Sequence, residues 1–578
     1  MASIGEFERA CENGASVQEE LLAGILRKNA STDYLQKFGS PQTPAAYKSQ
    51  VPIVSYEDVA GEIERIASGD ESPVLCQDPI ICFFASSGTS SGKHKIIPVT
   101  AENMSATTRA IELSSAYKAR CFPELGSGRV LGLYYCIDQF HTKAGILVGA
   151  GTTYTIKNYR NFSSKFTTPY EMIVSGSNWR ELTYCHLLCG LIQRDAVEHI
   201  ESMFAYTICE SLRILESDWE EICNDIRTGS LISGKVTHAK LQEAFARLIL
   251  DYNELDRVRN AEAITKICSR KSWSGILSLL FPRAKLVSTV VTGGMAHFVP
   301  QLRDYAGVKL PISGKDYYSS EGVLGINTNP ASPLEEVVFT ILPHIMYHEF
   351  LPLGANNPAG EILAPHEVVV GQEYEIVITN FAGLYRYRVG DVVKVSSFFH
   401  GVPQLAFSHR KNAVLSVQNE MVDEQELQNV VMEVSKEAGI EVANFTAYGN
   451  STAVPAHYVI FWELKRREGI NRELLERCCS SIDRSFNPGY TGKRLDEVID
   501  SLELVIVKEG TFERLMEEAV RNGTSPAQYK TPRCVTSPRM LEVLESGRVQ
   551  SYKSGEMPRS VLESWEPSFP QGSASRDA

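Results

Sequence analysis

The chain has 578 residues, of which 43% are hydrophobic and 22% charged, with a formal net charge of −13. This length exceeds the size at which a single core stops growing, so two or more domains are expected. The acidic balance argues against a nucleic-acid-binding protein, because such proteins usually carry a basic face.

Cellular location is predicted from what the sequence does not contain. No apolar run approaches the roughly 18 residues of a membrane span, and the N-terminus has Glu6, Glu8 and Glu12 where a signal peptide would be apolar. Thirteen cysteines are scattered without metal-ligand spacing. We therefore expect a cytoplasmic protein in a reducing compartment, with no membrane contact, and a monomer by default.

The first half of the chain contains a segment rich in small residues. It follows an amphipathic helix at 17–28 and an apolar, strand-like run at 79–85, and reads Ser86, Ser87, Gly88, Thr89, Ser90. Small residues allow close approach of an anion, so the segment is either a phosphate-binding loop or a surface hairpin. A P-loop is disfavoured, because only three residues separate Gly88 from Gly92 and His94 follows Lys93.

The pattern after this segment alternates between helices and strands. We expect a helix at 102–119, strands at 129–138 and 145–156, a strongly helical region at 181–229, helices within 241–280 and a strand at 285–292. His186 lies in the helical region and is interpreted as a core histidine. Period-2 alternation at 373–399 predicts an antiparallel meander with turns at 380–383 and at Gly390-Asp391.

After Arg410 the organisation changes to a small α+β pattern. Helices are expected at 423–438, 471–486 and 512–522, and strands at 441–448, 457–464 and 502–507. We therefore predict an N-terminal domain at 1–410, a C-terminal α+β domain at 411–566, and a disordered tail at 567–578.

Three separated motifs carry a resemblance to a known family. The segment 86–95, the segment 317–322 (YYSSEG) and the segment 385–391 (YRYRVGD) resemble the three adenylation motifs of adenylate-forming enzymes. Together with blocks such as LFPRAKL and GTSPAQYKTPRCV, they are similar to the Gretchen Hagen 3 family of plant acyl acid amido synthetases. The resemblance extends from about Leu21 to Val535.

This resemblance implies a fold and an activity. The fold would be α/β: a large adenylate-forming domain, with β-sheets flanked by helices and a barrel-like meander, and a smaller mobile α+β domain after a hinge near Asn412. The activity would be ATP- and Mg²⁺-dependent adenylation of an acyl acid hormone (jasmonate, indole-3-acetate or a benzoate). Transfer to an amino acid would follow, with release of AMP and pyrophosphate.

The resemblance also implies roles for individual residues. The phosphates of ATP would contact Ser86, Ser87, Gly88, Thr89 and Ser90. The adenine and α-phosphate would contact Thr292, Gly293, Tyr317, Tyr318, Ser319, Ser320 and Gly322. Glu321 would bind Mg²⁺, Asp391 would bind the ribose, and Lys530 would be the catalytic lysine. The substrates would contact Met104, Thr107, Gly149, Thr152, Thr153, Tyr154 and Thr155, with Lys315 near the acyl carboxylate.

Three positions depart from the family pattern. Phe84 replaces a usual serine, Tyr318 replaces a small residue, and Lys315 stands where jasmonate-type members carry histidine. They put the identity of the substrate in doubt more than the reaction class. Two alternatives remain open: an enzyme that passes the acyl group to coenzyme A, and a catalytically silent hormone-binding protein.

Overall fold

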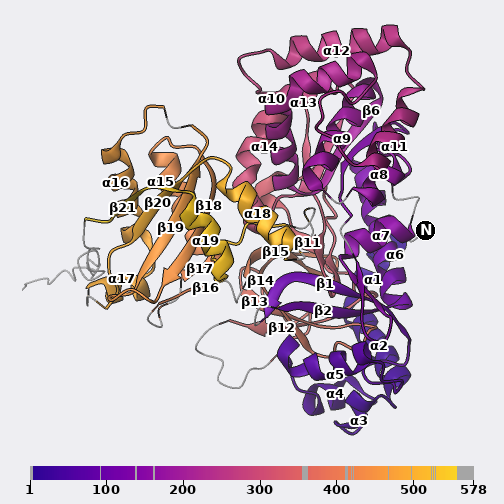
Figure 1. Cartoon of the computed structure of the whole chain (residues 1–578). Coiled ribbons are helices and arrows are strands. Elements are labelled where there is room, and N and C mark those ends of the chain that lie inside the picture. Colours follow the sequence, from indigo (N-terminus) through magenta and orange to yellow (C-terminus); the bar gives the residue numbers. More distant parts are fainter. Residues whose placement is uncertain are drawn as a thin grey trace, which may run out of the picture. The chain divides into compact units, whose positions relative to one another are not determined.

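The computed structural model describes residues 4–555 apart from 91–92, 137–138, 160–162, 177, 354–361, 411–413, 418–419, 421, 467, 496–497, 523, 525 and 527–528. The predicted hinge residue Asn412 and the predicted tail at 567–578 lie outside the described residues. The chain divides into two compact units (Figure 1). The first runs to His409 and also includes Ala519–Lys530, and the second contains Arg410–Glu518 and the chain from Thr531 onward. Both combine sheets with helices, so the predicted α/β class is confirmed.

Helices open the first unit. They are α1 (Ile4–Glu12), α2 (Gly14–Asn29), α3 (Asp33–Gln36), α4 (Pro44–Gln50) and α5 (Tyr56–Ser68). The amphipathic helix predicted at 17–28 forms most of α2, and its Leu22 and Leu26 are fully buried. Gln18 of α2 is buried as well, and its amide donates hydrogen bonds to the carbonyl oxygens of Pro343 and Met346 at 2.6 and 2.8 Å. These bonds join the N-terminal helices to a distant part of the unit.

The small-residue segment lies in a sheet of order β2-β1-β5-β4. Its strands are β1 (Ile80–Ser90), β2 (Lys93–Thr100), β4 (Phe140–His141) and β5 (Leu147–Gly149). β1 and β2 pair antiparallel, with Thr89 opposite His94, and β5 pairs with β1 in parallel. The segment is thus a β-hairpin whose tip, 91–92, lies outside the described residues. Helix α6 (Ala101–Cys121) follows, where a helix is predicted at 102–119.

The strand predicted at 145–156 is wrong beyond Gly149. Helix α7 (Gly151–Asn158) begins two residues later. Threonine and tyrosine favour strands, but Thr153 and Ile156 are both buried and lie three residues apart, on one face of the helix. A Cβ on Gly151 would lie 3.3 Å from the Phe84 ring, so this glycine allows the helix to approach β1 closely. Packing therefore overrides the local preference.

A second sheet of the first unit is entirely parallel, with the order β3-β6-β7-β8. Its strands are β3 (Arg129–Leu133), β6 (Val197–Phe204), β7 (Leu286–Val290) and β8 (Ile312–Gly314). The helices of this part of the chain are α8 (Tyr170–Ser175), α9 (Trp179–Ile192), α10 (Ala205–Thr228), α11 (Ala239–Ile249), α12 (Glu254–Cys268), α13 (Ile276–Leu280) and α14 (Val299–Ala306).

The continuous helical region predicted at 181–229 is wrong in its middle. Strand β6 interrupts it between α9 and α10. Along β6, Ile200, Ser202 and Phe204 are buried at alternate positions, as expected for a strand. Val197 and Ile200 are also spaced like one turn of a helix, which explains the error. His186 on α9 is fully buried, in agreement with its interpretation as a core histidine.

An antiparallel sheet of order β11-β15-β14-β13-β12 completes the first unit, beside the hairpin β9–β10. The strands are β9 (Tyr317–Ser319), β10 (Gly322–Gly325), β11 (Phe339–Thr340), β12 (Tyr347–Pro352), β13 (Glu373–Thr379), β14 (Tyr387–Phe399) and β15 (Val402–Arg410). The predicted turn at Gly390-Asp391 is wrong, because β14 continues through both residues. The register with β13 shifts between Glu375 and Val377, and Gly390 has a φ of 82°, so the irregularity is a bulge within one strand.

The second unit has one sheet of order β18-β19-β20-β21 (Figure 1). Its strands and the small pair beside them are β16 (Val414–Leu415), β17 (Val422–Asp423), β18 (Val442–Asn450), β19 (His457–Leu464), β20 (Glu503–Val507) and β21 (Arg548–Lys553). The helices are α15 (Glu424–Glu437), α16 (Arg472–Ser485), α17 (Pro488–Leu495), α18 (Thr511–Arg521) and α19 (Pro538–Ser546). Every helix and strand predicted after Arg410 is present within two residues of its expected bounds.

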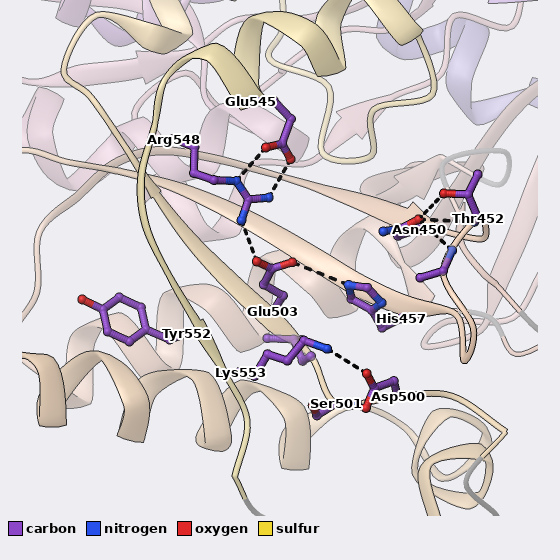
Figure 2. A network of polar contacts seen from close by, with 12 residues as sticks. Asn450, Thr452, His457, Asp500, Ser501, Glu503, Glu545, Arg548, Tyr552 and Lys553 are labelled. Atoms are coloured by element: carbon purple, nitrogen blue, oxygen red, sulfur yellow. Dashed lines mark hydrogen bonds and ion pairs between the residues drawn. The ribbon is translucent and has the colours of Figure 1, made fainter.

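A polar network joins three strands of this sheet near their ends (Figure 2). Glu503 of β20 accepts a hydrogen bond from Nη1 of Arg548 at 2.6 Å, and its other carboxylate oxygen lies 3.6 Å from Nε2 of His457. Arg548 also donates to Glu545 at 2.6 and 2.7 Å. The network therefore connects β19, β20 and β21 through charged side chains.

Two general properties of the chain bear on its chemistry. Across the described part of the chain, no helix combines the length and the apolar character that a membrane crossing requires. All thirteen cysteines are free thiols, including the buried neighbours Cys478 and Cys479.

Candidate functional site

Three of the predicted site residues lie at the carboxyl edge of the parallel sheet. Thr292 and Gly293 follow β7, and Lys315 follows β8. In open α/β sheets, ligands bind beyond the carboxyl ends of the strands, because loops from neighbouring strands meet there. Four parallel strands thus bring together segments that are up to about 180 residues apart in the chain.

Tyr317 and Asp391 come from different motifs and meet in the interior. Tyr317 Oη donates a hydrogen bond of 2.7 Å to Oδ2 of Asp391, whose exposed fraction is 4%. The bulge at Gly390 places Asp391 at this point of β14. The ring of Phe407 lies 5.9 Å from that of Tyr317, and a Cβ on Gly293 would lie 2.9 Å from it. Two of the predicted nucleotide contacts, Tyr317 and Gly293, therefore lie against the ring of Phe407, and a third, Asp391, is bonded to Tyr317.

Glu321 lies in the turn between β9 and β10. Its carbonyl oxygen accepts a hydrogen bond from Nδ2 of Asn380 at 3.0 Å. Burial and the neighbouring Glu321 carboxylate raise the pKa of Tyr387 well above its usual value. Gly322 has a φ of 144°, and a Cβ there would lie 2.7 Å from Cε of Met346, so the turn after Glu321 requires glycine.

Among the described residues, a magnesium site at Glu321 would have fewer than three protein side chains as ligands. The described residues contain no group of three or more His, Cys, Asp or Glu side chains arranged to hold a metal. Mg²⁺ in nucleotide sites is usually held by one or two carboxylates together with phosphate oxygens and water. Glu321 therefore fits as the protein's contribution to such a site.

The hairpin that carries Ser86, Ser87, Gly88, Thr89 and Ser90 is described by its backbone alone. The ladder is irregular between Ala85 and Thr89, so this part of β1 departs from regular pairing. Lys95 of β2 lies 3.5 Å from Glu57 and 5.1 Å from the ring centroid of Tyr56. These contacts hold Lys95 against α5.

Most of the predicted substrate contacts lie beside this hairpin. Met104 of α6 belongs to a small apolar cluster with Cys82 and Val99, against which Phe84 and Tyr154 pack. Gly149 is the backbone partner of Phe84 across β5 and β1. Thr107 lies on α6 and Thr155 on α7. The hydroxyl of each donates a hydrogen bond of 2.9 Å to a backbone carbonyl one turn earlier in its own helix. Thr152 and Thr153 also lie on α7, and not on the strand expected for them.

Phe84 has a structural partner. Its ring meets that of Tyr154 edge-on, with centroids 5.9 Å apart, and it covers Gly151. Phe84 thus makes an aromatic contact between β1 and α7, and it packs against the apolar cluster that contains Met104.

Lys315 lies apart from these contacts, in a buried polar cluster. Its Nζ lies 3.4 Å from Oε2 of Glu201 and donates to Oη of Tyr134 at 2.5 Å. Tyr134 in turn donates to Oε1 of Glu201 at 3.3 Å. Neither Tyr134 nor Glu201 is among the predicted site residues, and Glu201 lies in a segment that is predicted to be helical. The alternation of His199, Glu201 and Met203 with Ile200, Ser202 and Phe204 along β6 is the signal that could have placed Glu201 on a strand.

The fully buried His186 positions the Tyr134 backbone. Its Nε2 donates to the carbonyl oxygen of Tyr134 at 2.9 Å, so its Nδ1 accepts from the hydroxyl of Thr168 at 2.7 Å. Burial lowers the pKa of His186 to about 4, which keeps the ring neutral. The core histidine thereby supports the residue that contacts Lys315.

Glu201 is ionised despite its position. Burial alone would raise its pKa, but the nearby Lys315, together with other cationic groups, lowers it to about 2.

Tyr318, which the sequence analysis found to depart from the family pattern, belongs to the same region. Its hydroxyl donates to Oδ2 of Asp316 at 2.9 Å. Burial, followed by the charge of Asp316, raises the pKa of Tyr318 well above its usual value. Tyr318 is therefore a neutral donor.

Lys530 lies at the same edge of the parallel sheet. Its segment, Ala519–Lys530, is compact with the first unit. The ammonium of Lys530 lies 4.9 Å from the ring centroid of Phe204, the last residue of β6. The neighbouring Tyr529 is buried and meets Tyr206 edge-on at 5.8 Å. The structure thus places the predicted catalytic lysine next to the strand that carries Glu201.

Comparison with known proteins assigns the family. The N-terminal domain model of the GH3 family matches residues 3–312, the central domain model matches 339–410, and the C-terminal domain model matches 425–539. The chain belongs to the GH3 family. The resemblance noted in the three motifs is therefore confirmed along almost the whole length of the protein.

Relatives of this GH3 protein carry the names of amido synthetases. It is 40% identical to jasmonoyl-L-amino acid synthetase JAR6 of Nicotiana attenuata, over 95% of this chain and 96% of the relative. It is 37% identical to indole-3-acetic acid-amido synthetase GH3.10 of Arabidopsis thaliana, over 95% and 98% of the two chains. The solved structure of GH3.15 acyl acid amido synthetase superposes with a TM-score of 0.87 at 34% identity, covering 96% of this chain and 97% of that one.

Proposed function

We propose that this GH3 protein is an acyl acid amido synthetase that uses ATP and Mg²⁺. It joins an acyl acid hormone to an amino acid through an amide bond. The observation that carries the proposal is its similarity, over 95% of its length, to proteins named as amido synthetases of jasmonate and indole-3-acetate. The hydrogen bond between Tyr317 and Asp391, which joins two of the three motifs, supports it.

Two steps make up the proposed reaction. A carboxylate oxygen of the acid attacks the α-phosphorus of ATP, and the bond to pyrophosphate breaks. The amino nitrogen of the amino acid then attacks the acyl carbon, loses a proton, and displaces AMP. Adenylation is needed because a free carboxylate is a poor electrophile with a poor leaving group.

The proposal gives each predicted residue a role. Asp391 is a buried carboxylate held by Tyr317, and a carboxylate can accept two hydrogen bonds from the ribose hydroxyls. Glu321 would bind Mg²⁺, which neutralises phosphate charge when it is bound. Lys530 would offset the negative charge that builds up at the α-phosphorus. Lys315 would lie near the acid, and the small residues of the hairpin would surround the phosphates.

The proposal names three classes of acid as the substrate: jasmonate, indole-3-acetate or a benzoate. The relatives are named for the first two. Apolar contacts discriminate by only about 1–3 kcal/mol per methylene-sized difference. The choice among the three classes therefore depends on polar contacts as well as on shape.

The experiment is pyrophosphate release with ATP and Mg²⁺, using jasmonate, indole-3-acetate, salicylate and substituted benzoates, each with and without amino acids. We expect release tied to one acid and an amide product detected by mass spectrometry. Glu321→Gln should abolish release, whereas Glu336→Gln, at an exposed carboxylate, should not. A thioester formed with coenzyme A would contradict the proposal, and so would the absence of pyrophosphate release by the folded protein with every acid.

We also propose that the protein works as a monomer in the cytoplasm. Light scattering on the eluted protein should give a mass close to the 64.1 kDa of one chain. A fluorescent fusion should follow a cytoplasmic marker.

A further inference from the structure

The residues that follow Lys530 are bound to the edge of the second unit's sheet. In the order β18-β19-β20-β21, β18 is an outer strand, so one of its sides can pair with a further segment. Segment 531–535 occupies part of this side. The N–H of Ala447 donates to the carbonyl oxygen of Arg533, and the N–H of Val535 donates to that of Ala447, both at 2.8 Å. The chain is therefore fixed directly after the predicted catalytic lysine.

Side chains add a second set of bonds between β18 and this segment. Nδ2 of Asn444 donates to Oγ1 of Thr531 at 2.9 Å, and Oδ1 of the same amide accepts from Nη1 of Arg533 at 3.2 Å. Nη1 also donates to the carbonyl oxygen of Phe445 at 2.7 Å, and the guanidinium carbon lies 4.0 Å from the centroid of the Phe445 ring. One asparagine thus holds the segment on both sides of Pro532.

These polar groups are buried, and the backbone between them is stiff. Asn444, Thr531 and Arg533 are exposed by only 3%, 4% and 2%. Removal of one partner would leave a buried polar group unsatisfied, which is costly, so the bonds are strongly maintained. Proline fixes its own φ and restricts the residue before it to extended conformations. Segment 531–533 is therefore a rigid base.

Lys530 is one peptide bond away from this base. Consecutive Cα atoms lie about 3.8 Å apart, so a fixed Thr531 confines the backbone of Lys530 to a small region. The Lys530 side chain itself is exposed, in contrast to that of Thr531. A rigid attachment matters for catalysis, because a misplacement of about 1 Å can lower a rate by about 100-fold.

We propose that Asn444 and Arg533 are positioning residues for Lys530. They hold segment 531–533 on β18, so that the lysine extends from a rigid base and follows this sheet in any movement of the second unit. Both residues act through the lysine and not through contact with a substrate. This inference rests on the proposed function, in which Lys530 acts during adenylation.

The test measures the two half-reactions of the full-length protein separately. Asn444→Ala should lower pyrophosphate–ATP exchange by about 10- to 100-fold, because the lysine loses its fixed base. Amide formation from chemically prepared acyl-AMP should stay within about threefold of the wild type. Thr531→Val removes the hydroxyl but keeps the branched shape, so it should show the same split, whereas Thr531→Ser should retain most of the exchange. Tyr490→Phe is the matched control: it removes a buried hydrogen bond of 2.5 Å to Asp483 in the same unit and should change neither rate.

A double variant separates positioning from general damage to the fold. In the Lys530→Ala background, Asn444→Ala should lower the residual exchange by no more than about twofold, because no lysine is left to position. A further tenfold loss in that background would overturn the role of Asn444. Equal slowing of both half-reactions by Asn444→Ala and Thr531→Val would overturn it as well.

Hydrogen exchange of the full chain keeps this inference separable from the proposed function. Asn444→Ala should increase exchange at the N–H of Val535, whereas Tyr490→Phe should leave it unchanged. If that increase is found in a protein that releases pyrophosphate with none of the acids, the ligase proposal fails and the attachment of segment 531–535 by Asn444 stands. Unchanged exchange at Val535 would overturn the attachment, whatever the activity.

Discussion

Asp391 is a buried carboxylate that depends on its charge for the proposed ribose contact. Asp391→Asn keeps an oxygen that can accept from Tyr317, so the fold should be retained. Loss of the charge should raise KM for ATP by about 10- to 100-fold, because hydrogen bonds to charged groups contribute about 1.5–3 kcal/mol. The measurement is pyrophosphate release as a function of ATP concentration. Glu336→Gln is the matched control, and an unchanged KM for ATP in Asp391→Asn would remove Asp391 from the nucleotide site.

Arg386 supports the fold near this site through a buried ion pair. Its guanidinium donates to both oxygens of Glu349 at 3.1 Å, and Nη1 also donates to the carbonyl oxygens of Lys48 and Val51 at 2.7 and 2.9 Å. Arg386→Met should lower the free energy of unfolding by about 3–5 kcal/mol, because it leaves a fully buried carboxylate without its partner. Lys28→Met, which breaks an exposed pair with Asp78, should cost about 1 kcal/mol or less. Urea unfolding of the two variants side by side measures the difference, and equal midpoints would contradict it.

Single residues were predictable from the sequence where their chemistry is local. The motif residues Tyr317, Glu321 and Asp391 could be proposed because each stands in a short recognisable segment. Their partners could not, since the Tyr317–Asp391 bond joins residues 74 positions apart.

The bulge in β14 is the structural element that places Asp391. Gly390 has a φ of 82°, a conformation that costs a residue with a Cβ about 1–2 kcal/mol. Gly390→Ala should therefore lower stability by about that amount and also raise KM for ATP, because relief of the strain moves Asp391. Gly371→Ala is the matched control: Gly371 has a φ of 89° and open space around it, so the strain is the same but no site residue follows. If both variants change KM for ATP equally, the bulge has no special role.

The network on β19, β20 and β21 predicts a dependence on pH (Figure 2). His457 beside it, with help from Arg548, lowers the pKa of Glu503 from 4.5 to about 2 in the folded protein. The folded state therefore favours the ionised form. Its contribution to stability is complete above about pH 5 and is lost as the pH falls from about 4.5 to 2. Because part of the Glu503 side chain remains accessible to solvent, which screens its charge, we expect about 1–2 kcal/mol.

Hydrogen exchange of the full chain can follow this effect at β20. Protection of the backbone of Glu503–Val507, corrected for the intrinsic effect of pH, should fall between about pH 4.5 and 2 in the wild type. Glu503→Gln should flatten the fall. Glu473→Gln, at an exposed carboxylate in the first turn of α16, should leave it unchanged. Identical profiles for all three proteins would show that Glu503 does not control the stability of this sheet.

Elements were predictable where local pattern and tertiary packing agree. His457–Leu464 is a buried strand whose residues are mostly apolar or aromatic, and its predicted bounds match the structure. The predictions of secondary structure for residues 145–156 and 197–204 were wrong for opposite reasons. The first contains strand-forming threonines in a helix that packs on Phe84, and the second contains helix-like spacing in a strand paired on both sides. In both cases the deciding contacts come from distant parts of the chain.

At the scale of the whole molecule, the chain forms two units while one short segment crosses the division. Ala519–Lys530 is compact with the first unit, although the chain on either side of it belongs to the second. We propose that the second unit is mobile and that this segment carries Lys530 into the adenylation site. The contact of Lys530 with the ring of Phe204 then identifies the carboxyl end of β6 as part of its surroundings.

Lys530 allows the two half-reactions to be separated. Its positive charge is needed when negative charge builds up at the α-phosphorus, but not when a neutral amine attacks the acyl carbon. Lys530→Ala should therefore lower pyrophosphate–ATP exchange by about 100-fold or more, since one stabilising group at a transition state contributes about 2.7–4 kcal/mol. The same variant, supplied with chemically prepared acyl-AMP, should form the amide at a rate within about threefold of the wild type. Lys240→Ala should leave both rates unchanged. If Lys530→Ala slows both half-reactions equally, the lysine supports the structure of the site and does not act in adenylation.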